Sequence, residues 1–386
     1  MMNSEKKNLI FLPKSLLVIS LASQFVSCGS PTNSSSDILV SSVQHTAAKR
    51  QSIGNCWIYA QATWLESLTL SNTGEKLNVS ESYWTYWHWY NDLVNSSMTE
   101  IQPGGTWTES SQIVVAHGWL EEKDFIYDEA GEEMSNRQKS ALEHMNTQLK
   151  TGGRLATRAS RTPKNIRAEL DKAFGVVMAD AQKKARKASE TFVGKRSDNT
   201  KISLVDALRG GVNDRWELVD FPQIYGKNTR ATPSQEASRK KILRRVMKAL
   251  NDRKPVVMSL MIDFNALDIT DQTFKEAKIK VNGGSGRQGG HMLVLHDYAV
   301  KDVPGVGVIP EGDQPNDMKL KALEGQITML KAKNSWGTNR PDRGLTDGFT
   351  RFEANYLMNQ LEWKNEASTS STFYTTLSEF VLPPGY

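Results

Sequence analysis

The spacing of apolar and polar residues changes along the chain, from helical spacing in the first part to strand-like runs in the last. From Cys56, the sequence CWIYAQATWLESLTL places apolar side chains three and four positions apart. This pattern predicts a buried amphipathic helix that begins at the cysteine, with Asn55 as its N-cap. A second helix is predicted in LNVSESYWTYWHWYNDLV, opened by Ser80 or Ser82, and a third after the glycine turn of QPGGTW.

Residues 131–220 differ in character, because basic residues outnumber acidic ones, aromatic residues are few and helix-forming runs recur. We interpret this range as a charged, largely helical insertion. Its basic face is either solvated surface or, as the alternative, a site for anionic partners such as lipid headgroups. The runs KPVVMSLMID, GGHMLVLHDYAV and ITMLKAKNSWG then predict strands. Helices first and strands later predict an α+β fold with two halves.

Composition narrows the class of protein but does not identify a function. The 386 residues are 38% hydrophobic and include ten tryptophans, enough for a sizeable core. The net charge of +5 is mild and does not favour a nucleic-acid partner. The sequence has no metal-binding spacing and no phosphate-binding loop, so we expect no metal and no cofactor. Its oligomeric state is not indicated.

The N-terminus has the features of an export signal. Residues 1–27 combine a basic start with an apolar run too short to span a bilayer, and FVSCGS then resembles a bacterial lipoprotein signal with Cys28 as the lipidated residue. An ordinary secretory signal is the alternative. Residues 28–46 are polar and suit a flexible tether, which leaves 47–386 as the folded domain. We therefore expect a lipid anchor in the bacterial cell envelope, at the outer membrane or facing the periplasm.

Cys56 and Cys28 are the only cysteines of the chain. If lipid occupies Cys28, Cys56 has no partner for an intramolecular bridge. A lone thiol in an exported protein is either reactive or sheltered from oxidation. Packing as a small hydrophobe remains the structural alternative.

A nucleophile, a base and an orienting amide follow one another along the chain. Cys56 begins a helix, His291 begins an apolar strand after two glycines, and Asn334 ends another strand. A helix N-terminus and a nearby imidazolium lower the pKa of a thiol, and the histidine can protonate a leaving amine. An asparagine oxygen can hold the other ring N–H. This order is typical of thiol acyl-transfer enzymes.

Together these residues resemble the papain-like cysteine peptidases, and NVSESYWTYW with PGGTW resembles the bleomycin hydrolase and aminopeptidase branch. The resemblance is carried by Gln51, Gly54, Cys56, Trp57, His291, Tyr298 and the run Asn334-Ser335-Trp336-Gly337. It implies a two-part fold, with a helical half that carries the cysteine and an antiparallel β half that carries the histidine and asparagine. It also implies a peptide or protein substrate.

The resemblance also implies a role for each matched residue. Cys56 would be the nucleophile, His291 the general acid and base, and Asn334 its orienting partner. Gln51 would supply an oxyanion-hole amide, although it lies five residues before the cysteine where the family usually has six. The remaining matches imply substrate-binding positions at Gly104, Gly105 and Trp336, and Trp336 would also shield the histidine–asparagine contact from water.

Two other functions remain open alongside the peptidase. One is a non-catalytic binding or adaptor lipoprotein on the same fold, and the other is an amidase or transpeptidase that acts on cell-wall peptides. His296 is a second candidate base, although its spacing from His291 favours a structural role on the opposite strand face. The aromatic run YWTYWHWY suits core packing, with a glycan-stacking platform as the alternative.

Overall fold

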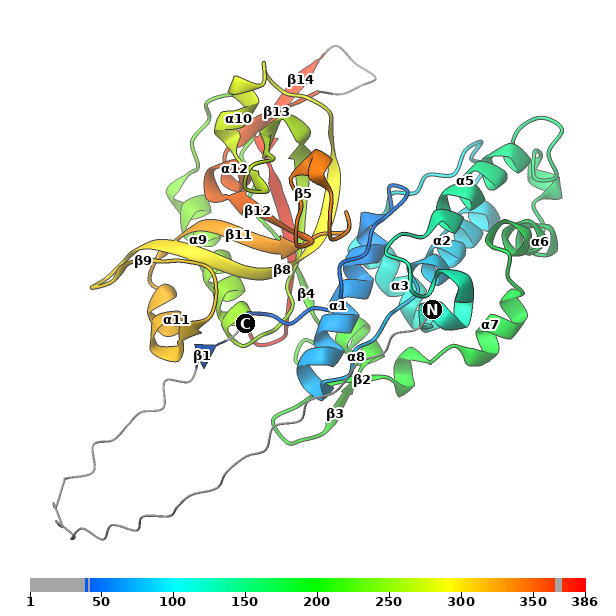
Figure 1. The fold of residues 1–386 in the computed structure, drawn as a ribbon, viewed down its shortest axis with the longest axis horizontal. Helices are drawn as coiled ribbons and strands as arrows, with labels where there is room; N and C mark the ends of the chain where they lie inside the picture. Colours follow the sequence, from blue (N-terminus) through cyan, green and yellow to red (C-terminus); the bar gives the residue numbers. More distant parts are fainter. Residues whose placement is uncertain (1–38, 41, 365–369) are drawn as a thin grey trace, which may run out of the picture. The chain divides into compact units, whose positions relative to one another are not determined.

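The computed structural model describes residues 39–40, 42–364 and 370–386. Its helices are α1 Cys56–Thr73, α2 Glu81–Asn95, α3 Trp107–His117, α4 Glu122–Phe125, α5 Asn136–Leu149, α6 Pro163–Phe174, α7 Met178–Lys184, α8 Leu204–Arg209, α9 Pro233–Asn251, α10 Glu276–Val281, α11 Asn316–Ala322 and α12 Ala354–Met358. Its strands are β1 Leu39–Val40, β2 Phe192–Lys195, β3 Lys201–Ser203, β4 Glu217–Asp220, β5 Val257–Asp263, β6 Leu267–Asp268, β7 Thr273–Phe274, β8 Gln288–Val303, β9 Gly307–Ile309, β10 Gln314–Pro315, β11 Gln326–Lys333, β12 Phe349–Glu353, β13 Gln360–Lys364, β14 Ser371–Thr375 and β15 Leu377–Leu382. The division into a helical part and a largely antiparallel β part is shown in Figure 1 and confirms the predicted α+β class.

The first three helices begin where the sequence predicted them. Helix α1 starts at Cys56 itself, and α2 is capped by the hydroxyl of Ser80, which accepts from the backbone N–H of Tyr83. Helix α3 has a complete capping box between Thr106 and Glu109. The aromatic run of α2 lies in the core, as predicted, with exposures of 0–1% at Tyr83, Trp84, Tyr86, Trp87 and Trp89. These five rings leave no exposed platform for stacking a glycan.

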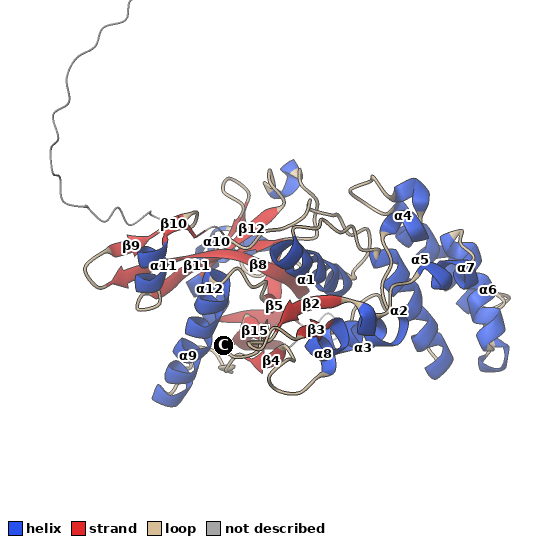
Figure 2. Ribbon diagram, turned by 90° about the horizontal axis from the view of Figure 1, so that it is seen from below, coloured by secondary structure: helices blue, strands red, loops and turns tan. Residues whose placement is uncertain are grey.

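The main sheet has the strand order β4-β15-β5-β8-β11-β12-β7-β6, antiparallel except between β12 and β7. Side chains alternate between its two faces, as in any strand. One face joins the core of the helical part through Val257, Met292, Val294 and Val381. The other face builds the core of the β part with Met258, Leu260, Leu293, Leu295 and Phe380. Helix α1 therefore packs directly on the sheet, against β8 (Figures 1 and 2).

The predicted boundary at residue 47 falls inside packed structure. Val43 is fully buried; its backbone N–H donates to the carbonyl of His296, and its own carbonyl accepts from Nδ1 of the His296 ring. The folded part of the chain thus begins before residue 47, because this segment is hydrogen-bonded to β8. The predicted signal 1–27 and Cys28 lie outside the described residues. Among the helices that are described, none is both long enough and apolar enough to cross a membrane.

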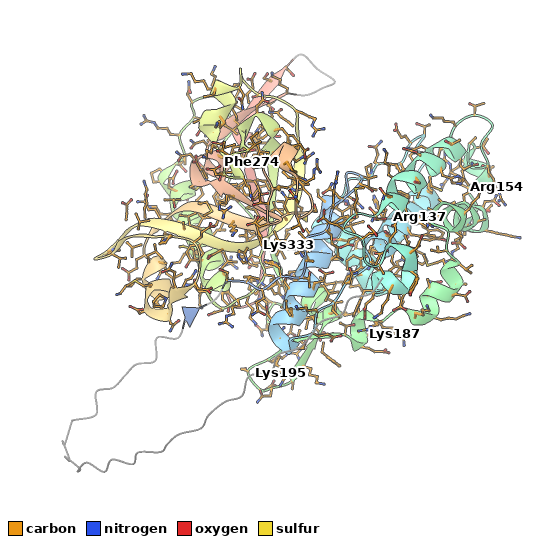
Figure 3. The ribbon with its side chains drawn as sticks, in the orientation of Figure 1. Arg137, Arg154, Lys187, Lys195, Phe274 and Lys333 are labelled. Atoms are coloured by element: carbon orange, nitrogen blue, oxygen red, sulfur yellow. The ribbon has the colours of Figure 1, made fainter. Side chains whose placement is uncertain are left out.

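The range 131–220 is mainly helical, but it is built into the helical core. Its helices α5 to α8 contribute buried side chains to the same core as α1 to α3, namely Ala141, Met145, Leu149, Ile166, Leu170, Phe174, Ala207 and Leu208. Strand β4, at the C-terminal end of this range, pairs with β15 in the main sheet. Lys187, labelled in Figure 3, forms an ion pair with Glu190 in which both side chains are exposed, as a solvated face would show. Arg154, also labelled, is half exposed and pairs with the buried Glu169.

A buried network of charges joins α1 to the β part of the molecule. Glu66 of α1 accepts from Lys49 at 2.8 Å, and Lys333, at the end of β11, lies 3.9 Å from the same carboxylate (Figure 3). Lys49 also pairs with Glu81 at 2.9 Å. Burial acts to lower the pKa of Lys49, but the two carboxylates outweigh it and raise that pKa. Burial lowers the pKa of Lys333 to about 8.

We expect the substitution Glu66→Gln to destabilise the protein by about 3 kcal/mol, because it leaves buried ammonium groups without their central carboxylate. Lys49 would retain Glu81, which places the cost at the lower end for a broken buried pair. The measurement is the midpoint of urea unfolding at neutral pH, with an unchanged m-value as the check on two-state behaviour.

The matched control is Asp180→Asn, which breaks an exposed pair with Lys183 and should leave the midpoint almost unchanged. Equal shifts in the two variants would contradict a special role for the buried network.

Candidate active site

Cys56 occupies the first position of α1. Asn55 is the N-cap residue, as predicted, but its side chain makes no capping hydrogen bond, because its amide donates to Thr85 and Gln138 instead. Its backbone carbonyl accepts from the backbone N–H groups of Ile58 and Tyr59. The helix N–H groups that precede Ile58 therefore have no partner within the helix. A helix N-terminus of this kind favours negative charge. The sulfur is therefore placed where a developing anion is stabilised.

The imidazole of His291 is held by Asn334 in a defined orientation. Nε2 of the ring lies 2.8 Å from Oδ1 of Asn334. That oxygen also accepts the backbone N–H of Ser335, and the asparagine Nδ2 donates to Thr350. Because a backbone N–H can only donate, the amide oxygen must face the ring, and Nε2 must carry the hydrogen. The neutral imidazole is thus the tautomer whose Nδ1 is free to accept a proton.

Trp336 covers the ring of His291 and does not line the cleft. The two ring centroids are 5.2 Å apart with an interplanar angle of 27°. The guanidinium of Arg343 lies 4.4 Å from the Trp336 ring centroid. Trp336 is only 5% exposed, so it shields the histidine–asparagine contact from solvent. Its predicted shielding position is observed, whereas its predicted substrate-binding position is not supported, because Trp336 does not line the cleft.

Cys56 and His291 line one cleft of about 440 Å³ at the junction of the two parts. The backbone N–H of Met292, the residue after His291, hydrogen-bonds the sulfur of Cys56. Both predicted glycines line the same cleft. A Cβ at Gly105 would lie 2.6 Å from the ring of Trp57, whereas one at Gly104 would meet nothing within 4 Å. Gly105 thus serves internal packing, and Gly104 faces open space.

The structure does not bring Gln51 into the cleft. Its Nε2 donates to the backbone carbonyl of Ile53 at 2.7 Å, and its Oε1 accepts from the hydroxyl of Ser335. The side chain links the loop before α1 to the loop after β11. The predicted oxyanion role is therefore not supported, which agrees with its unusual spacing from Cys56.

His296 has a structural role, as its spacing favoured. Its Nδ1 donates to the backbone carbonyl of Val43 at 2.9 Å, and the centroid of its ring lies 4.5 Å from that of the Phe349 ring. It does not line the cleft that holds Cys56. His291 is the histidine that lines the cleft together with the thiol.

Burial disfavours both charged forms of the pair. Burial raises the pKa of the Cys56 thiol to about 11. The backbone N–H groups of Met292, Trp57 and Cys56 lower this pKa and so offset part of the rise. Burial lowers the pKa of His291 to about 4, which the bond to Asn334 opposes and the charge of Arg343 reinforces. In this structure desolvation thus outweighs the helix terminus in its effect on the thiol pKa, in the direction opposite to the expected lowering. At neutral pH the pair rests as thiol and imidazole.

Several residues of the site carry no local sequence signal. Ser259 and Met261 of β5, and Ser378 and Glu379 of β15, line the cleft although their strands are far from the motifs. Thr350 fixes the amide of Asn334 from β12. Only the pairing of these strands reveals them. Within the residues described, no group of three or more His, Cys, Asp or Glu side chains is arranged to hold a metal.

No protein-family model matches the chain, and no curated protein is similar to it in sequence. Among solved structures, it is similar to xylellain, a cysteine protease from Xylella fastidiosa, with a TM-score of 0.35 and 11% identity over 90% of this chain and 86% of that chain. It is also similar to a chain from a study of the mite allergens Blo t 1 and Der p 1, with a TM-score of 0.31 and 13% identity over 91% of this chain and 75% of that one. Both TM-scores are low, so the function proposed below rests on the geometry of the site itself.

We expect iodoacetamide to alkylate Cys56 slowly at pH 5.5, with a rate that rises only at alkaline pH. A thiol of pKa about 11 is about one thousandth thiolate at pH 8, against a quarter or so for an ordinary thiol of pKa about 8.5. The measurement is the alkylation rate of the full chain carrying Cys28→Ser, which has a single thiol.

The companion variant is His291→Ala, which should keep the alkaline rise. Fast alkylation at pH 5.5 that disappears in this variant would instead reveal a thiolate–imidazolium pair and contradict the neutral resting state.

Proposed function

We propose that this chain is a cysteine peptidase of the papain-like kind, which hydrolyses peptide bonds through a thioester at Cys56. The observation that carries the proposal is the contact between Nε2 of His291 and Oδ1 of Asn334, from which the hydrogen is assigned to Nε2. Asn334 accepts the Nε2 hydrogen, so the basic Nδ1 is left for the thiol in the same cleft. This is the division of roles that general-base activation of a thiol requires.

In the acylation step, the sulfur of Cys56 bonds to the carbonyl carbon of the substrate while its proton moves to Nδ1 of His291. The neutral resting pair fits this order, because charge separates only when the substrate arrives. The tetrahedral oxyanion then lies at the free N-terminus of α1, where the backbone N–H of Cys56 is a donor. Collapse breaks the C–N bond, and the imidazolium gives its proton to the leaving amine.

Deacylation repeats the sequence with water. His291 removes a proton from the water, whose oxygen bonds to the thioester carbonyl carbon. When the second tetrahedral intermediate collapses, the C–S bond breaks, the carboxylic acid leaves and the thiol regains its proton from the ring. Trp336 and Asn334 keep the imidazole in one orientation through both steps.

The cellular setting proposed for this activity rests on the sequence of the N-terminus alone. Cys28 would carry lipid after cleavage of residues 1–27, and the domain would be tethered to the bacterial cell envelope. Peptides or proteins outside the cytoplasm would then be its substrates.

We expect Cys56→Ala to abolish peptide hydrolysis, His291→Ala to lower kcat by at least about 100-fold, and Asn334→Ala by a smaller factor. The sulfur is the nucleophile, the ring moves the proton, and the amide only orients the ring. The measurement is the release of fragments from a mixed peptide library, followed by mass spectrometry, with purified wild type and variants.

A thioester on Cys56, trapped with acid during turnover, would add the acyl mass to the wild type and not to Cys56→Ala. Full activity in Cys56→Ala would refute the proposal. Activity confined to cell-wall peptides with D-amino acids would favour the amidase alternative.

The glycine pair offers a matched test of substrate approach. We expect Gly104→Ala to fold normally but to raise KM, because the added methyl group enters open space in the cleft. Gly105→Ala should lower stability by about 1–3 kcal/mol, because its methyl group meets the ring of Trp57. Thermal unfolding and steady-state kinetics of both variants separate the effects. Loss of stability in Gly104→Ala without a change in KM would contradict its place in the cleft.

A further inference from the structure

The cleft that holds Cys56 and His291 is acidic, although the chain as a whole is basic with a net charge of +5. Within the described residues, no lysine or arginine lines this cleft, and its one carboxylate is Glu379 of β15. A charge placed inside a substrate cleft acts at short range and in partly dry surroundings, where it discriminates among ligands more strongly than surface charges do.

Strand register sets how far Glu379 lies from the reacting residues. Glu379 is the cross-strand partner of Ser259 on β5, and Ser259 is the partner of Met292 on β8. Two strand spacings, roughly 10 Å in total, therefore separate Glu379 from the residue next to His291. Directly paired residues share a face, and this face is the one that packs toward α1. An extended peptide advances about 3.3 Å per residue, so a long side chain one or two residues from the scissile bond reaches Glu379.

The carboxylate of Glu379 is oriented but not neutralised. Its Oε1 accepts from the hydroxyl of Ser259 at 2.9 Å. Neither of its oxygens belongs to an ion pair with another described residue. Burial raises the pKa of Glu379, the Ser259 hydroxyl opposes this, and the nearby charge of Asp220 adds to it. A cation entering the cleft would relieve both the desolvation and the repulsion.

The region next to the cleft, beyond Glu379, is also acidic. A second hollow, of about 570 Å³, shares Ser378 and Glu379 with the cleft and is lined further on by Asp220 and Tyr225. Tyr225 is 69% exposed, and its ring lies 6.3 Å from that of Tyr374. No lysine or arginine among the described residues lines this hollow either. Carboxylates attract a cation by their charge, and the faces of exposed aromatic rings attract it through cation–π interactions.

We propose that Glu379 selects substrates that bring a cationic group, an Arg or Lys side chain or a terminal ammonium, to a position one or two residues from the cleaved bond. This inference rests on the proposed peptidase function and names its substrate class. Ser259 positions the carboxylate, and the substrate cation takes a place that no lysine or arginine among the described residues occupies.

The first experiment compares alanine hexapeptides that carry arginine, or its neutral isostere citrulline, at each position in turn. Each peptide is tested with a free and with an acetylated N-terminus, and kcat/KM is measured for the full-length protein. A charge-assisted hydrogen bond predicts that arginine exceeds citrulline by roughly 10- to 100-fold at one position. A preference for the free terminus over the acetylated one, at similar size, would identify the terminal ammonium as the cation. Equal rates across both comparisons would overturn the proposal.

Charge variants then assign the preference to one residue. Glu379→Gln should reduce the arginine-to-citrulline ratio to within about 3-fold, and Glu379→Lys should favour a glutamate peptide over its glutamine counterpart. The control is Glu190→Gln, which removes an exposed carboxylate far along the chain and should keep the wild-type ratio. An unchanged ratio in Glu379→Gln would overturn the proposal even if Glu379→Lys fails to fold.

Binding separates this inference from the proposed chemistry. Calorimetry on Cys56→Ala measures the affinities for the same arginine and citrulline peptides without turnover. A preference for arginine that Glu379→Gln removes would support the cationic site even if the wild type cleaves none of the peptides, in which case only the peptidase proposal fails. Equal or undetectable binding of both peptides would overturn the cationic site, whatever the cleavage results.

Discussion

The site exists because helix α1 is fixed against strand β8. The helix carries the thiol at its first residue, the strand carries the imidazole near its start, and neither is useful without the other. Two interactions fix the contact: the apolar face of the sheet that enters the helical core, and the buried network around Glu66, Lys49 and Lys333. The apolar contact is non-directional, whereas the charge network accepts only one placement of α1, since a misplaced helix would leave charges buried and unpaired.

The same packing that assembles the site also sets its resting state. Cys56 and His291 are both buried in the cleft, and this loss of contact with water favours the neutral form of each side chain. The uncapped start of α1 and the bond from His291 to Asn334 act in the opposite direction. In the proposed acyl transfer they would be in place before the charges develop.

Charge is distributed unevenly between the outer surface and the cleft. Basic side chains of the helical part are paired with acids at the surface, as for Lys187 with Glu190, whereas the cleft walls present Glu379 and no described cation. The overall net charge therefore says little about what the protein binds. What matters is which charges lie where water is partly excluded, and this is decided by the strands that form the walls.

The sequence by itself determined the first three helices, the strands that carry His291 and Asn334, the α+β class and the burial of the aromatic run, and it singled out Cys56, His291 and Asn334 as the candidate site. These depend on periodicity and on short motifs, which are local properties of the chain. It placed Asn55 correctly at the N-cap but not its side chain, which donates to Thr85 and Gln138. The predicted role of Gln51 is not supported, because that side chain bonds to Ile53 and Ser335. The sequence did not indicate Glu379. Only the tertiary structure decided these points, because the partner of a polar side chain and the lining of a cleft depend on strand register and on packing between separate elements, for which no local pattern exists.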